Sequence, residues 1–191
     1  EALTTGFDDM PELIRSGSFD YVLVRPLPAL LFVLGRDVKL RILGRSLQGA
    51  FAVCISVMHL QLDWDVSHLA LLATSVICGV TVYAGLFVAS AAQCFWTVES
   101  TEMFNAFTYG GAQMTEYPVS LYPGWLRSIF LYVVPVGFVS YVPAVALLGK
   151  TDPLGLSPWG VWATPLVAGT FLGACLFFWR LGMRRYEGAG G

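Results

Sequence analysis

The sequence predicts an all-α membrane protein, a polytopic bundle of transmembrane helices. Two features of the composition predict this: 56% of the 191 residues are hydrophobic and only 13% are charged. Soluble domains carry roughly 25% charged residues, and a disordered chain needs low hydrophobicity and a high net charge. The third feature is a set of uncharged stretches that match the bilayer, because about 20 apolar helical residues span a hydrocarbon core of ~30 Å.

Four stretches reach or approach this length. The first is short and is expected to extend into the residues before Arg45. The second is the clearest span, the third is interrupted by two prolines, and the fourth contains one proline and has tryptophans near its ends, as in the aromatic belts of membrane proteins. The expected spans are, in order, about 46–62, 69–95, 128–148 and 159–180.

The stretch 98–116 is harder to place, because it holds three carboxylates, Glu99, Glu102 and Glu116. An ionisable group at membrane depth is by default a candidate functional group. Because the three carboxylates lie near the two ends of the stretch, a polar-lined span that faces protein is allowed. These glutamates are then candidates for a translocation path. The alternative is an interfacial segment that never crosses.

The basic residues set the expected orientation, since they mark cytoplasmic flanks. Six of the eleven precede the first span and three follow the last, so residues 1–45 and 181–191 are both expected in the cytoplasm. An even number of crossings follows. Either 98–116 crosses and 128–148 re-enters from outside, or 98–116 stays at the surface and 128–148 crosses. The prolines of 128–148 favour the re-entrant form, because lipid cannot satisfy the backbone groups that they free.

Several functional classes are disfavoured by the sequence. A net charge of −2 leaves no basic surface for nucleic acid. The four cysteines form no CxxC pair, so we expect neither a metal site nor a disulfide framework. Gly149-Lys150-Thr151 lacks the first glycine of a phosphate-binding loop. We therefore expect no catalytic residues and no cofactor on this chain.

Residues 9–17 are predicted to form a short helix, because residues typical of a helix start and of a helix end bound them. Asp8 or Asp9 is expected at the N-cap, Pro11 lies in the first turn, and Gly17 follows the end. Such a helix is too short to be stable alone in water.

The apolar side chains of this short helix share one face. Met10, Leu13 and Ile14 stand at i, i+3 and i+4, while Glu12 and Arg15 point elsewhere. We expect the apolar stripe to rest in a groove of a protein partner.

Four further segments carry a family resemblance. They read IRSGSFDYVLVRPLP at 14–28, YPVSLYPGWLR at 117–127, VPVGFVSYVPA at 134–144 and WRLGMRRYEGAG at 179–190. Together with Phe95-Trp96, they resemble motifs of the type-2 ABC transporter permeases and occur in the same order. The subfamily is that of small paired permeases encoded beside an ATPase. The chain departs from that pattern at Gly188, where serine is common.

The resemblance implies a non-catalytic permease of an ATP-driven exporter in the bacterial cytoplasmic (inner) membrane. The partners it implies are two copies of an ABC ATPase, which bind the ATP and magnesium, and a second permease, homologous or identical. It also implies six spans, so two further spans, roughly 60–80 residues, are expected before Glu1 in addition to the single permease domain 1–191. The substrate would move by alternating access.

The resemblance also assigns roles to residues near the start of the chain. It implies that the helix at 9–17 is a coupling helix that docks on the ATPase. Because proline biases the residue before it away from helix, we expect Arg25 and Pro26 to set the turn that leads into the membrane, with the Arg25 guanidinium at the lipid headgroups or on the ATPase. The implied ATPase-coupling residues are Asp9, Met10, Leu13, Ile14, Arg15, Gly17, Arg25 and Pro26. Two other classes stay open: a membrane scaffold that transports nothing, and a secondary transporter that uses the three glutamates for ion coupling.

Overall fold

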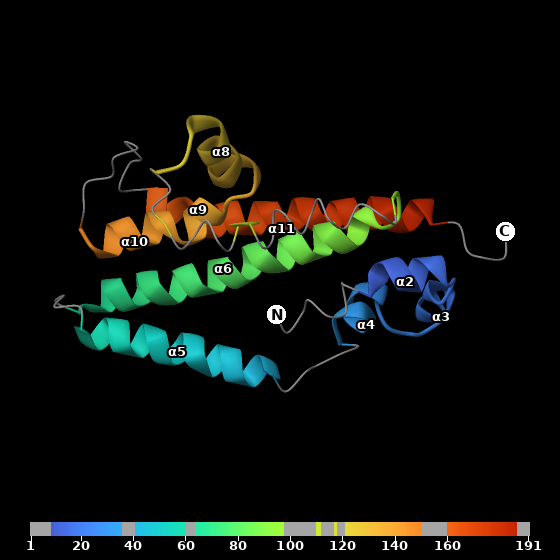
Figure 1. Cartoon of the computed structure of the whole chain (residues 1–191), viewed down its shortest axis with the longest axis horizontal. Helices are drawn as coiled ribbons and strands as arrows, with labels where there is room; N and C mark the ends of the chain where they lie inside the picture. Colours follow the sequence, from blue (N-terminus) through green and yellow to red (C-terminus); the bar gives the residue numbers. More distant parts are fainter. Residues whose placement is uncertain are drawn as a thin grey trace. The chain divides into compact units, whose positions relative to one another are not determined.

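The computed structural model describes residues 9–35, 41–59, 64–97, 110–111, 117, 121–149 and 160–186. Within these ranges all regular secondary structure is helical, which confirms the predicted all-α class (Figure 1). The described residues divide into two compact units, which lie within 9–59 and 64–186.

The described part of the first unit begins with three short helices, α2 (Met10–Arg15), α3 (Phe19–Leu23) and α4 (Ala29–Gly35). The helix α2 stops as its sequence predicts, because Gly17 adopts a φ of 69° that side-chain-bearing residues avoid. Apolar residues of all three helices are buried, and their burial compensates for the low intrinsic stability of such short helices. The buried residues are Met10, Leu13, Phe19, Val22, Ala29 and Val33.

The longest helix in the described part of this unit is α5 (Arg41–His59). It begins four residues before Arg45, so the helix extends toward the N-terminus as expected for the first span. Its uncharged apolar part, Ser46–His59, is shorter than a full crossing within the described residues. Large side chains such as Leu47, Phe51 and Met58 are exposed. That this helix spans the membrane stays a prediction.

Two long helices dominate the second unit, α6 (Val66–Gln93) and α11 (Gly160–Arg185), and both are long and apolar enough to cross a membrane. They correspond to the expected spans 69–95 and 159–180. Asp65 caps α6, since its carboxylate accepts a hydrogen bond of 2.7 Å from the backbone N–H of Val66.

The helices α6 and α11 lie side by side and run in the same direction (Figure 1). Near their starts, Leu71 and Trp162 line one pocket. Near their ends, the rings of Phe95 and Trp179 meet edge to face at 5.2 Å. If both helices cross the bilayer, they therefore cross it in the same sense, and the intervening chain returns to the starting side.

The returning part of the chain contains a bent segment made of α8 (Gly124–Ser128), the π-helical turn η2 (Ile129–Val133), α9 (Val136–Val139) and α10 (Tyr141–Leu147). The halves Gly124–Val133 and Val136–Leu147 meet at 71°. Pro135 stands at the break, where its missing N–H and fixed φ prevent a continuous helix. The predicted interruption of 128–148 is thus observed.

The break of the bent segment packs into the core of the second unit. Val136 is only 1% exposed, and its cluster includes Val82 of α6 and Ala168 of α11, with Phe171 packed against it. Val82 lies about midway along the part of α6 that contacts α11. Phe171 lies about midway along α11. The tip of the bend is therefore at the middle of these two helices.

Candidate functional site

The predicted coupling helix exists as α2, and its start differs in one detail from the expectation. Asp9 occupies the N-cap position, and its backbone carbonyl accepts a 3.0 Å hydrogen bond from the N–H of Leu13. Its side chain, however, makes no capping hydrogen bond. The first turn is favoured instead by Pro11, whose fixed φ suits that position.

The apolar stripe of α2 packs against the chain itself. Met10 is 0% and Leu13 5% exposed, and Ile14 is partly buried, whereas Glu12 and Arg15 are exposed. This differs from an apolar stripe left free for a partner's groove. The most exposed residues of α2 are the two charged ones.

Arg25 and Pro26 lie in the turn between α3 and α4, where the proline was expected to break the helix. Both are exposed, but the guanidinium of Arg25 is not free. It lies 4.7 Å from the ring centroid of Phe32 in α4, a cation–π contact. This contact lies across the turn, and the expected place of the guanidinium at the lipid headgroups or on the ATPase stays a prediction.

The candidate path residues Glu99, Glu102 and Glu116 lie outside the described residues. Between them in the sequence, however, Gly111 is described and buried. A Cβ at this position would lie 3.5 Å from atoms of Phe130 and of Val136. At Gly111 the chain therefore lies beside the tip of the bent segment.

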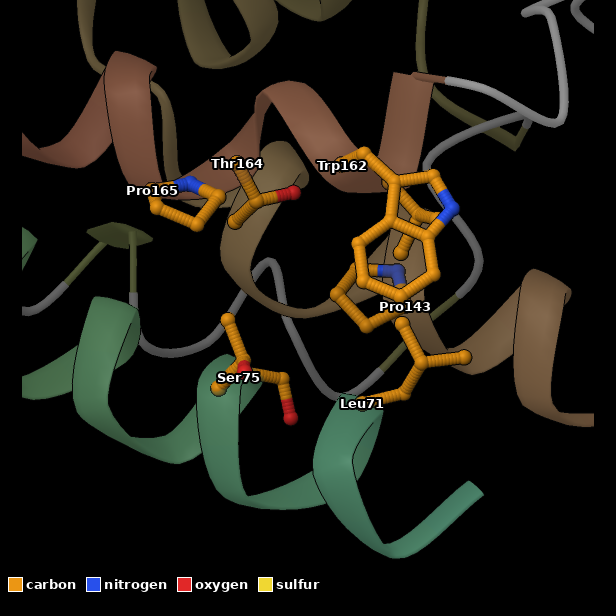
Figure 2. Close-up of a pocket in the computed structure, with 8 residues that line it drawn as sticks. Leu71, Ser75, Pro143, Trp162, Thr164 and Pro165 are labelled. Carbon is orange, nitrogen blue, oxygen red and sulfur yellow. The ribbon is translucent and has the colours of Figure 1, made fainter. Parts of the chain in front are cut away.

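A small open hollow, with room for about one water molecule, lies between α6, α10 and α11 (Figure 2). Thr74, Ser75 and Thr164 contribute hydroxyl groups to its otherwise apolar lining. Ser75 donates to the carbonyl of Leu72 at 2.7 Å, and Thr164 to that of Phe138 at 3.4 Å. The lining offers no ionisable group, and no cluster of metal-ligating side chains occurs among the described residues.

Pro143 and Pro165 also line this pocket, one from α10 and one from α11. Because proline has no N–H, Pro165 leaves the carbonyl of Val161 without its helical donor. Pro165 lies inside an otherwise regular helix, so the break expected of proline does not end α11 here. The pocket is thus a weak point of helix packing near the starts of α6 and α11.

Comparison with known proteins decides the family. A family model described as ABC-2 family transporter protein matches residues 2–190. The chain belongs to this family. No curated protein and no solved structure matches the chain.

As a member of the ABC-2 family, the chain is a multi-pass membrane protein of the permease type, which works with an ABC ATPase. Members of this family are generally non-catalytic membrane components. The match agrees with the resemblance drawn from the sequence motifs, and the apolar helices α6 and α11 supply the membrane-length elements that a permease requires.

The structure also reveals an aromatic cluster that sequence reasoning missed. Phe95 meets Trp179 and Tyr186 edge to face, and Trp96 stacks on Phe178 at 4.7 Å with planes only 9° apart. In the ABC-2 protein this cluster joins the ends of α6 and α11. The sequence showed these residues as parts of two separate motifs, and only the parallel packing of the helices brings them together.

Proposed function

We propose that this chain is the permease subunit of an ATP-driven exporter, which moves its substrate by alternating access while a separate ATPase subunit hydrolyses ATP. The observation that carries the proposal is the family match over nearly the whole chain. The two parallel membrane-length helices and the bent segment between them are consistent with such a subunit.

The proposal includes a topology in which 98–116 crosses the membrane and 128–148 re-enters from the outside. The parallel course of α6 and α11 requires one crossing between them, which either stretch could make. One observation supports a crossing by 98–116. Gly111 lies at the middle depth of the unit, where a segment confined to the surface would not reach. The 71° bend at Pro135 then forms the tip of the re-entrant segment.

The proposed contact with the ATPase uses the exposed face of α2. Glu12 and Arg15 stand three residues apart on this face, so both can reach one partner surface. On the opposite face, Met10 and Leu13 are buried and anchor α2 to the rest of its unit. The Arg25–Phe32 contact then stiffens the turn that follows α3. In this arrangement a displacement of α2 by the ATPase is passed on through packed side chains. ATP and magnesium bind to the two ATPase copies, and a second permease completes the path.

Co-purification tests the proposed contact. The affinity-tagged chain, solubilised from its native membrane, is expected to carry an ABC ATPase, identified by its phosphate-binding loop in peptide mass spectrometry. E12A/R15A is expected to reduce the bound ATPase by at least tenfold, because both substitutions remove exposed side chains and keep a good helix former. Gln48→Ala on α5, also at an exposed site, serves as the control and should leave the ATPase bound.

The same experiment separates the alternatives. A chain that purifies without any ATPase would support a scaffold or a secondary transporter and would contradict the proposal. ATPase binding that survives E12A/R15A would retain the permease but move the contact away from α2.

A further inference from the structure

Three exposed arginines lie at the end of α11: Arg180, Arg184 and Arg185. In the described part of residues 64–186 the only acidic residue is Asp65, which caps the start of α6. Because α6 and α11 run in the same direction, Asp65 lies toward the opposite end of the pair from the arginines. Among the described residues of this unit, the charged side chains at the end of α11 are therefore all positive.

The arginines lie on an outward face of α11, and the part of this face that precedes Arg180 in the helix is apolar. Phe177 is 63% exposed, and nothing lies within 4 Å of a Cβ placed at Gly173. Helical spacing puts Gly173, Phe177, Arg180 and Arg184 on one side of the helix. The opposite side, with Trp179 and Gly182, is buried against α6 and the residues that follow it. We call this outward set the arginine face.

The length of α11 places the arginine face at the membrane surface. Residues 160–179 of α11 carry no charge and extend about 30 Å along a helix, which matches the ~30 Å of a hydrocarbon core. Arg184 lies five residues beyond Trp179, about 8 Å further. Its guanidinium is then in the headgroup layer, while Phe177 stays among the acyl chains.

The aromatic cluster holds the helix end in place. Trp179 packs on Phe95, and Phe178 stacks on Trp96, so two successive residues just before Arg180 are fixed against the chain that follows α6. A fixed backbone lowers the entropy lost when guanidinium groups order around a ligand.

We propose that the arginine face binds an anionic phospholipid, with the lipid phosphate at Arg180 and Arg184 and an acyl chain along Phe177 and Gly173. Guanidinium groups bind phosphate oxygens through paired hydrogen bonds. The apolar part of the arginine face favours a lipid over a free phosphate ion, because only a lipid has an acyl chain that can contact it. Arg185 adds charge beside the pair and strengthens the attraction to an anionic surface.

Native mass spectrometry of the full chain in detergent tests the proposal, with titration of dioleoyl phosphatidylglycerol against dioleoyl phosphatidylcholine. The wild type is expected to bind the anionic lipid more tightly. R180Q/R184Q/R185Q is expected to weaken that binding by roughly 10- to 100-fold and to leave the neutral lipid unaffected. R180K/R184K/R185K keeps the charge and is the matched control, with most of the preference retained.

Two further measurements keep the outcome decisive. Phe177→Ser should weaken binding of the anionic lipid although every arginine is present, and inorganic phosphate at millimolar concentration should not displace the lipid. Equal affinity for the two lipids, or unchanged affinity in the glutamine variant, would overturn the proposal. A glutamine variant that keeps its lipid but loses the co-purified ATPase would also overturn it and would assign the arginines to a protein contact.

Discussion

Gly182 of α11 lies so close to Phe95 that no side chain fits between them. A Cβ at Gly182 would come within 2.5 Å of Cδ2 of Phe95, 3.1 Å of Cζ3 of Trp96 and 3.2 Å of the carbonyl oxygen of Ala92. One of these three neighbours is backbone, which cannot rotate away. The close approach lets the aromatic cluster form around the ends of α6 and α11.

We therefore expect Gly182→Ala to destabilise this helix pair by about 1–3 kcal/mol, the usual result of overpacking. Thermal unfolding of the purified protein in detergent measures the effect. Gly173→Ala is the matched control in the same helix, because its Cβ meets nothing within 4 Å. Alanine is also the better helix former, so the control should be neutral or slightly stabilising. Equal melting temperatures for the two variants would contradict the close packing.

Leu13→Ala is expected to loosen α2 within its own unit. Leu13 is buried, so the truncation should cost about 2–5 kcal/mol in the stability of the packed helices. Arg15→Ala is the control, because an exposed substitution usually changes stability by no more than about 0.5 kcal/mol. Hydrogen exchange of the α2 amides measures both. Unchanged protection in Leu13→Ala would show that the side chain is not part of the core.

The Arg25–Phe32 contact is expected to stabilise the turn between α3 and α4 by about 0.5–1 kcal/mol. A double-mutant cycle of Arg25→Gln and Phe32→Leu measures this coupling through the unfolding free energy of the purified chain. Additive effects of the two substitutions would mean that the cation–π contact contributes nothing to stability.

Cysteine labelling tests the proposed topology, in a background without the four native cysteines. A cysteine at the exposed Leu148, just after α10, should react with a membrane-impermeant maleimide in intact cells. A cysteine at Arg185, at the end of α11, should react only after lysis, and one at Gly111 should be protected in both. Labelling at position 185 in intact cells would reverse the orientation, and ready labelling at position 111 would exclude a buried crossing.

The sequence predicted the elements of this fold better than their contacts. Uncharged length identified α6 and α11, and Pro135 identified the break, because both signals are local. Burial of Leu13 and the stacking of Trp96 on Phe178 depend on which elements meet in space. The helical spacing of Met10, Leu13 and Ile14 shows one apolar face and says nothing of what covers it, which is why that face was assigned to a partner.

ATP hydrolysis in proteoliposomes tests the central claim most directly. The ATPase that co-purifies with this chain is measured alone, with the wild-type chain, and with E12A/R15A. A permease coupled through α2 predicts that the wild-type chain changes the rate of hydrolysis several-fold and that E12A/R15A abolishes most of this change while remaining inserted in the membrane. A rate that is the same with and without the wild-type chain would contradict a permease driven by an ATPase on another subunit.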